Sequence, residues 1–310
     1  MSGLFGIINK PLGWVLESIA SLMGGNFAAA VFIFTLLINL ALVPLSIKSQ
    51  KSSVQQTRIR PKLDDIKKRY GDDRQKYSEA TQKLYQEEGV SMSGGCLPMI
   101  LRLVLMMSIY YLILSPLTYL MHIDAEVIKD AAEAIKTTAA ASRSNELLII
   151  EAVKSGKIAD QFPQIAERIN DIDFSFFGID LTQTPKFSFD IFHKAEPIWF
   201  MPVLAFGAQM LSSVLSMKMQ KKINPDAPSM AGMMLTMPLI SLFIGFGLPG
   251  GVAFYWACSS LIGGFIQLGV QAFYGPHRML SHEREKELMQ QYKFEAGKIE
   301  KISAKENKED

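Results

Sequence analysis

The sequence is poor in the side chains that build metal sites and disulfide frameworks. It contains only two cysteines, Cys96 and Cys258, and both fall inside apolar stretches, so a network of disulfides is excluded. The four histidines are far apart and show no metal-ligand spacing. Phosphate-binding glycine loops, nucleophile elbows and zinc motifs are also missing from the sequence. We therefore expect no metal, no cofactor and no enzymatic bond making.

Charge is also scarce, and it is unevenly distributed. Only 20% of the 310 residues are charged, whereas 49% are hydrophobic, and the mean hydropathy is +0.16. Nearly all charged residues lie outside apolar stretches of about 20 residues, the length that spans a hydrocarbon core of roughly 30 Å. This pattern is typical of a polytopic membrane protein and argues against a soluble enzyme. The net charge of +2 is too small to favour a specific nucleic acid as partner.

The apolar stretches predict five transmembrane helices, and the segments between them differ in charge. The predicted spans are 27–47, 95–121, 197–219, 231–249 and 250–273. The segment 48–94 carries eleven Lys and Arg against seven acids, whereas 122–196 carries eight against thirteen. Because Lys and Arg concentrate on the cytoplasmic side, we place 48–94, the loop 220–230 and the tail 274–310 in the cytoplasm. The N-terminus and the acidic loop 122–196, which we expect to contain helices, then face outward.

The first 26 residues predict a helix that lies in the outer membrane interface. Ile7, Trp14 and Leu22 fall near one helical face, and an amphipathic helix of this kind rests with its apolar face in the lipid boundary. Lys10 and Glu17 interrupt the apolar run, so we do not expect a cleaved signal peptide in 1–26.

The segment 48–94 predicts a cytoplasmic hairpin of two antiparallel helices. Gly71 suits the end of the first helix, and Asp72 or Asp73 suits the start of the second. The net charge of this segment is +4, which fits either anionic lipid headgroups or an incoming partner. The basic side chains that we expect to act there are Lys62, Lys67, Lys68 and Arg69.

A layer of polar residues crosses the predicted spans at one depth. The spans contain no Asp or Glu, and their one internal charge is Arg102, roughly 10 Å from the cytoplasmic end at 1.5 Å per residue. Polar residues of the other spans that we assign to the same site are Asn39, Thr35, Ser212, Thr236 and Gln267. Because such groups are costly against lipid, they predict a wet cavity that opens to the cytoplasm and is closed toward the outside.

Each member of this layer also has a structural alternative. Arg102 is shallow enough for its guanidinium to reach the headgroups, and single hydroxyls such as Thr35 and Ser212 often bond to their own helix or join two helices. A small-solute transporter or channel subunit that uses the Arg102 layer is the alternative function. The missing carboxylates and the missing inverted repeat argue against it.

Four runs of the sequence resemble the YidC family of membrane protein insertases, and they occur in the family's order. They are IRPKLDDIKKRYGDDRQK from Ile59, KLYQEEGV ending at Val90, GGCLPMILRLVLMMSIYYLI from Gly94 and MPLISLFIGFGLPGGVAFYWACSS from Met237. The resemblance implies an all-α polytopic membrane protein in which five helices surround a hydrophilic groove open to the cytoplasm. It also implies the single-core bacterial type, which lacks the large periplasmic β domain. Such a protein resides in the bacterial cytoplasmic membrane, binds nascent membrane proteins in the groove and releases their apolar segments into lipid.

Two positions depart from the family's pattern, and they do so together. The family usually has Arg at the position of Asn39 and Gln at the position of Arg102. We therefore hypothesise that the groove keeps its positive charge by moving it from the first span to the second. The resemblance also implies the Sec translocon and the ribosome as candidate partners, although the tail after Gly275, with eight basic and eight acidic residues, is less basic than ribosome-binding tails.

Overall fold

Helices make up nearly all of the structure. The computed structural model describes residues 2–90, 96–135, 145–185, 196–223 and 231–275, together with 288, 289 and 292. Among these residues the strands are β1 (Ser175–Phe176) and β2 (Ile179–Asp180), which form one short antiparallel hairpin. The predicted all-α fold class is therefore confirmed. Residues 224–230 of the predicted cytoplasmic loop, and nearly all of the predicted tail, lie outside the described residues.

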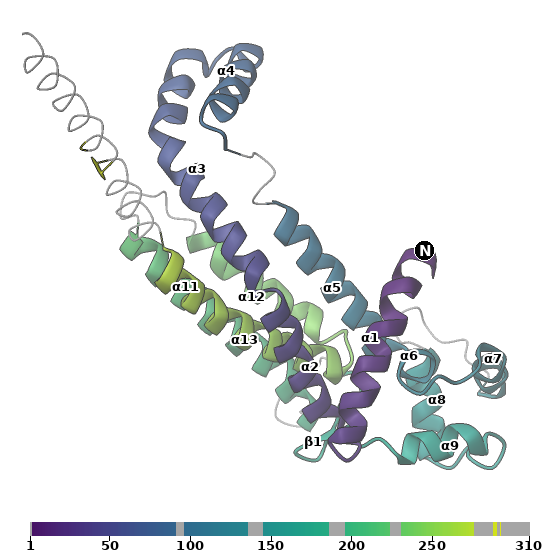
Figure 1. Ribbon diagram of the computed structural model, residues 1–310. Helices are drawn as coiled ribbons and strands as arrows, with labels where there is room; N and C mark the ends of the chain where they lie inside the picture. The colour runs from purple at the N-terminus through teal and green to yellow at the C-terminus, as the bar shows by residue number, and fades with distance from the viewer. Residues whose placement is uncertain are drawn as a thin grey trace, which may run out of the picture.

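The long helices form one elongated bundle (Figure 1). They are α2 (Phe27–Ala41), α3 (Val43–Tyr70), α5 (Cys96–Leu114), α11 (Phe200–Ile223), α12 (Ala231–Gly245) and α13 (Gly250–Tyr274). Helix α13 packs against all of the others, most extensively against α11. The α3–α4 hairpin projects from one end of the bundle, which we call the hairpin end, and α8 and α9 lie at the opposite end, which we call the loop end.

Length and composition allow some of these helices to cross a bilayer. Pro197–Met219 and Gly250–Tyr274 each qualify as single spans, and α2 with the first half of α3 qualifies as a bent pair. The apolar parts of α5 and α12, Ile100–Leu114 and Leu235–Gly245, are shorter. The chain is thus a membrane-integral helical protein, and the number of five spans stays a prediction.

Two of the predicted spans are interrupted next to prolines. Helices α2 and α3 meet at an angle of 48°, with Pro44 in the first turn of α3. Likewise α5 ends at Leu114, and the short helix α6 (Pro116–Tyr119) begins with a proline. Proline has no backbone N–H and its ring clashes with the carbonyl four residues earlier, which favours a break at both places, whereas Pro61 and Pro238 lie inside continuous helices.

The first helix of the predicted hairpin 48–94 is part of α3, and the first half of α3 also forms the second member of the bent pair. Helix α3 ends at Tyr70 with Gly71 as its C-cap, and Asp73 caps α4 (Arg74–Glu87) by accepting a hydrogen bond of 3.1 Å from the backbone N of Lys76, as predicted. Glu88, just after α4, hydrogen-bonds to Lys62 and lies 4.0 Å from Arg58. The hydrogen bond from Lys62 holds the pKa of Glu88 below its usual value. This ion-pair cluster ties the two hairpin helices together.

The hydrophobic core lies at the loop end. There α1 (Ser2–Leu22), α7 (Ala125–Ala134), α8 (Asn145–Lys154), α9 (Pro163–Asn170) and the 3₁₀ turn η1 (Pro197–Trp199) surround the ends of the bundle helices. Close packing is visible at Gly251 of α13, where an added Cβ would lie 3.0 Å from Ile113 Cγ2 and 3.6 Å from Phe27 Cε1. At this position α13 is therefore in close contact with α2 and α5.

Helix α1 packs on the bundle through a face other than the one predicted to enter the lipid boundary. Its buried positions include Gly13, Leu16 and Ala20, which let it approach α5 and α6 closely, whereas Ile7 and Trp14 are 73% and 64% exposed. The small residues permit close helix contact, so the bulky ones face away from the protein. These exposed apolar side chains are the part of α1 that is free to enter lipid.

The bundle helices also carry many exposed apolar side chains. Those that are about half exposed or more are Leu40, Ile100, Leu103, Phe200, Val203, Met237, Phe243, Ile244, Phe265 and Phe273. So many exposed large apolar side chains on the bundle helices are unusual for a soluble protein. They fit a surface whose solvent is the hydrocarbon interior of a bilayer.

A buried carboxylate joins the loop-end helices α6 and α8. Glu146 is 8% exposed and accepts hydrogen bonds from the Thr118 backbone N at 3.1 Å and the Thr118 Oγ1 at 2.7 Å. Burial raises the pKa of Glu146 above its usual value, although the Thr118 hydrogen bonds act in the opposite direction. The contribution of this group to stability is therefore fully present below the unfolded-state pKa and is lost as pH rises through the raised folded-state pKa.

We expect Glu146→Gln to remove this pH dependence. The amide oxygen of glutamine can still accept from Thr118, but it does not ionise. In thermal unfolding of the purified protein in detergent, the wild-type midpoint should fall more steeply with rising pH, above about pH 4, than that of the variant. Glu126→Gln, a change at an exposed acid of α7, should behave like the wild type. Equal slopes for the wild type and Glu146→Gln would contradict this assignment.

Candidate functional site

A polar cavity of about 350 Å³ lies in the hairpin half of the bundle. Its wall takes Asn39 from α2, Arg102 from α5, Ser212 from α11 and Gln267 from α13. Four of the six residues that the sequence analysis assigned to a groove thus line one cavity. We call it the polar cavity. The remaining lining residues are Gln209, Ser213, Ser216, Met237, Pro238, Ser259, Ser260, Gly263 and Gly264.

Two adjacent glycines of α13 let the neighbouring helices bring polar side chains close. A Cβ added at Gly263 would lie 3.3 Å from Asn39 Oδ1, and a Cβ at Gly264 would lie 2.6 Å from Ser212 Oγ. Asn39 is oriented by its own helix, because its Nδ2 donates a hydrogen bond of 2.8 Å to the Thr35 carbonyl oxygen. The glycines therefore set the distance between α13 and the polar side chains of α2 and α11.

Three lining residues of α11 were not predicted. Gln209, Ser213 and Ser216 recur at helical spacing with Ser212, so they share one face of α11. The sequence does contain the pattern that could have identified them, because these residues form a polar stripe on an otherwise apolar helix. Gln209 is held in place by Ser241 of α12, whose Oγ donates a hydrogen bond of 2.6 Å to Gln209 Oε1.

Two predicted residues do not line the polar cavity. Thr35 is buried and donates from Oγ1 to the Val31 carbonyl oxygen at 2.6 Å. Thr236 is exposed and donates in the same way to the Gly232 carbonyl oxygen at 2.6 Å. Both hydroxyls satisfy their hydrogen-bonding capacity on their own helix, which is the structural alternative named above for Thr35.

The electrostatics of the polar cavity are set by one cation. Arg102 is the charged residue among the lining residues, and the helix segments that form the wall contain no Asp or Glu. Within the described part of the chain, no carboxylate lies within ion-pair distance of Arg102. The cavity therefore offers an uncompensated guanidinium among neutral amides and hydroxyls, which attracts an anionic group more strongly than a neutral one.

The polar cavity is connected to the hairpin by direct contacts. Gln267 Nε2 donates to Gln50 Oε1 at 3.4 Å, and Lys51 Nζ lies 5.7 Å from the ring centroid of Tyr274. Both contacts join the first half of α3 to the end of α13. Because α3 continues into the hairpin, these contacts link the hairpin to the cavity wall.

The four basic residues predicted for the hairpin occupy two kinds of position. Lys62 pairs with Glu88 and so belongs to the ion-pair cluster that joins α3 to α4. Lys67, Lys68 and Arg69 are exposed in the last turn of α3, where positive charge is stabilised by the helix dipole. These three residues form the basic tip of the hairpin and are free to contact a partner or a membrane surface.

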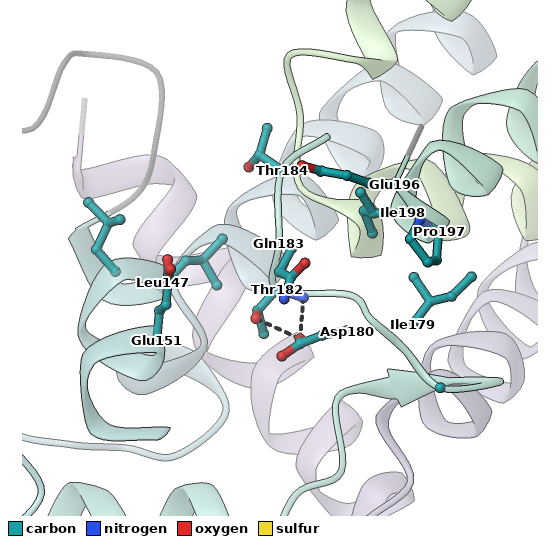
Figure 2. Close-up of a pocket in the computed structure, with 12 residues that line it drawn as sticks. Leu147, Glu151, Ile179, Asp180, Thr182, Gln183, Thr184, Glu196, Pro197 and Ile198 are labelled. Carbon is teal, nitrogen blue, oxygen red and sulfur yellow. Dashed lines mark hydrogen bonds between the residues drawn. The ribbon is translucent and has the colours of Figure 1, made fainter. Parts of the chain in front are cut away.

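An acidic cavity of about 390 Å³ lies at the loop end (Figure 2). Asp180 at its wall accepts hydrogen bonds from the Thr182 backbone N at 2.9 Å and the Thr182 Oγ1 at 2.6 Å, and Lys154 lies 3.0 Å from its other oxygen. Burial acts to raise the pKa of Asp180, but these hydrogen bonds outweigh it and the pKa lies below its usual value. The carboxylate is therefore fully used in tying the β hairpin to α8. Among the residues with described positions, no group of three or more His, Cys, Asp or Glu is arranged to hold a metal ion.

Comparison with known proteins identifies relatives along most of the chain. The chain is 24% identical over 298 residues to the membrane protein insertase YidC 2 of Listeria innocua, which covers 95% of this chain and 79% of that protein. It is 25% identical over 262 residues to the membrane protein insertase YidC of Dechloromonas aromatica, covering 84% of this chain and 35% of the relative. Over a shorter stretch of 113 residues, 36% of this chain and 20% of the relative, it is 35% identical to the YidC of Stutzerimonas stutzeri.

The comparisons also define how much of each relative the chain represents. It spans about a third of the length of several YidC relatives, such as those of Dechloromonas aromatica and Pseudomonas aeruginosa. A sequence profile described as 60Kd inner membrane protein matches residues 18–276, which include every helix that lines the polar cavity. The chain therefore belongs to the 60Kd inner membrane protein family, the YidC family that its motifs resemble.

Proposed function

We propose that this protein is a membrane protein insertase and chaperone of the bacterial cytoplasmic membrane, and that the polar cavity is its substrate groove. The observation that carries the proposal is the position of the cavity. Polar side chains from four helices, α2, α5, α11 and α13, meet in the hairpin half of the bundle, whereas the buried apolar core lies in the loop half. In the proposed orientation the hairpin end is cytoplasmic, the loop end faces outward, and the groove opens toward the cytoplasm.

A polar cavity that enters only part of the membrane lowers the barrier to moving a polar tail across it. Most of the free-energy cost of moving a hydrophilic group across a membrane arises in the hydrocarbon interior. A wet cavity shortens the length of hydrocarbon that the group must cross. Arg102 adds attraction for tails that carry Asp or Glu. The protein acts by binding and release, so no bond is made or broken.

The apolar segment of the substrate leaves sideways into lipid. Leu101 and Leu103 flank Arg102 on α5 and are 41% and 55% exposed, and Met237 of α12 lines the cavity and is 65% exposed. An apolar segment at this boundary exchanges contact with the polar wall for contact with acyl chains. Burial of apolar surface contributes about 25 cal/mol per Å², which drives release of the segment.

Site-specific photo-crosslinking during translation tests the proposal. A photoreactive amino acid at Ser216, on the cavity wall, should crosslink to a nascent membrane protein, whereas the same probe at Glu126, an exposed residue of α7, should not. Crosslinks of equal yield from both positions would contradict a groove. The transporter alternative predicts instead that reconstituted protein carries small solutes into liposomes. It also predicts that the probe at Ser216 forms no crosslink to nascent chains.

The proposed partners follow from the same function. Nascent membrane proteins are the substrates, and the basic tip of the hairpin contacts anionic lipids or the incoming chain. We keep the Sec translocon and the ribosome as candidate partners on the resemblance alone. The tail that would contact a ribosome lies outside the residues described above.

A further inference from the structure

A second membrane-level cavity, of about 550 Å³, lies at the loop end of the bundle. It is bounded by α2, α11, α13 and the β hairpin, through residues that include Phe32, Leu204, Phe254 and Phe176. We call it the loop-end slot. On α13 the slot takes residues from Phe254 to Leu261, whereas the polar cavity takes residues from Ser259 to Gln267, so the two cavities meet near the middle of this helix. The insertase proposal makes no use of it.

The loop-end slot is polar at its mouth and apolar along its depth. Asn26, Asp173 and Ser175 lie where α2 begins. From there Asn26 to Phe32 on α2 and Phe254 to Leu261 on α13 extend about 9 Å and about 11 Å at helical rise. These lengths stay within one leaflet of a hydrocarbon core roughly 30 Å thick. This order, a polar group at the surface followed by an apolar stretch, is the order of groups in a phospholipid.

The shape of the slot favours an acyl chain over a protein helix. A transmembrane helix is about 10–12 Å in diameter and needs a groove along the full membrane thickness, whereas the residues that line this slot end at Leu261, near the middle of α13. A volume of about 550 Å³ falls within the range of roughly 300–1,000 Å³ that is usual for small-molecule sites.

The mouth of the slot carries a carboxylate without a cationic partner. Asp173 is exposed, and its Oδ1 accepts a hydrogen bond of 2.8 Å from the Ser175 backbone N. No Lys or Arg of the described residues forms an ion pair with it. The surrounding loop 122–196 has thirteen acids against eight bases, a net charge of −5. This field disfavours an anionic headgroup and favours an ammonium group.

The β hairpin holds an aromatic side chain at this mouth in a costly conformation. Phe177 has a backbone φ of 49° and its side chain is 92% exposed. Its ring packs edge to face on Phe176 at 4.7 Å between centroids, and Phe176 in turn lies 4.7 Å from Phe254. A bulky residue in the left-handed region is strained, and an exposed Phe177 ring makes few contacts that would offset this strain. Contact between the ring and a lipid would offset it.

We propose that the loop-end slot binds one phospholipid with a primary-amine headgroup, whose acyl chain fills the slot and whose ammonium group pairs with Asp173. The lipid comes from the leaflet that borders the loop end. The proposal requires that the chain is integral to the membrane and does not depend on insertase activity.

Native mass spectrometry of the purified full chain tests the proposal with two probes, phosphatidylethanolamine and phosphatidylglycerol with identical acyl chains. The wild type should retain the ethanolamine lipid about two- to fivefold better, the effect of one partly exposed charge pair. Asp173→Asn keeps the acceptor for Ser175 and should abolish this preference. Asp171→Asn, which removes an exposed acid two residues away, should preserve it. Ala29→Leu, which fills the slot, should weaken retention of both lipids.

Several results would overturn the proposal. They are equal retention of the two lipids by the wild type, an unchanged preference in Asp173→Asn, and formation of a dimer that Ala29→Leu abolishes, which would make the slot an interface between two copies. If Ala29→Leu lowers the thermal midpoint of the protein, its lipid retention is not interpreted. The proposal is then judged by comparing the lipid preference of Asp173→Asn with that of Asp171→Asn. We expect Asp173→Asn to insert substrate proteins at the wild-type rate. This result would show that the lipid site acts independently of the polar cavity.

Discussion

Replacing Arg102 with Ala should slow the insertion of a substrate with a short acidic tail by about tenfold. A hydrogen bond to a charged group contributes roughly 1.5–3 kcal/mol, and about 1.4 kcal/mol corresponds to a factor of ten in rate. Arg102 is the charged residue on the cavity wall, so its removal leaves only neutral amides and hydroxyls. The measurement is the initial rate of insertion into proteoliposomes, with a neutral-tailed version of the same substrate as comparison.

The position of the charge can be tested together with its presence. Asn39 and Arg102 line the same cavity from α2 and α5, so the double variant Asn39→Arg/Arg102→Gln should recover most of the lost rate. Lys48→Ala removes an exposed cation outside the cavity and should have no effect. If Arg102→Ala inserts acidic and neutral tails at wild-type rates, the guanidinium has no role in substrate capture and its structural alternative, contact with the headgroups, is correct.

Gly264→Leu should reduce the insertion of every substrate, whatever the charge of its tail. A Cβ at Gly264 would lie 2.6 Å from Ser212 Oγ and 3.2 Å from Ser212 Cβ, so α11 and α13 must separate or the side chain must fill the cavity. Overpacking of this kind costs about 1–3 kcal/mol, which corresponds to a loss of roughly five- to 150-fold if it acts on substrate binding. The loss should appear equally in insertion rate and in crosslinking from Ser216.

Gly269 provides the matched control for this substitution. It lies on the same helix, and a Cβ there would meet no atom within 4 Å. Gly269→Leu should therefore insert substrates normally. Gly264→Ala, which adds the Cβ alone, should fall between the two. A folded Gly264→Leu protein with normal insertion would show that substrates do not use the polar cavity.

Depth along the helices could be predicted from the sequence, whereas rotation about them could not. Helix rise is constant, so counting from one membrane surface grouped Asn39, Arg102, Ser212 and Gln267, which line one cavity, with Thr236, which does not. The same count gave no information on the direction of each side chain. The Thr35 hydroxyl consequently bonds to its own helix, and the stripe through Ser216 on α11 was overlooked.

Local signals in the sequence also accounted for part of the fold. Gly71 and Asp73 marked the turn of the hairpin because their chemistry suits helix ends. The bend before α3 could have been inferred from Pro44. The burial of Glu146 could not, because its partner Thr118 is 28 residues away in the sequence and the contact exists only in the packed loop end.

Cysteine accessibility in sealed membrane vesicles tests the central claim most directly. In a variant with Cys96 and Cys258 replaced by Ala, a Ser259→Cys substitution places the reporter on the cavity wall at mid-helix in α13. A membrane-impermeant maleimide should label this cysteine when it is added on the side of the hairpin, and leave it unlabelled when it is added on the side of the acidic loop. Labelling from neither side would mean that the cavity is dry. Labelling from both sides would mean that water crosses the whole bundle, and either result would contradict the account.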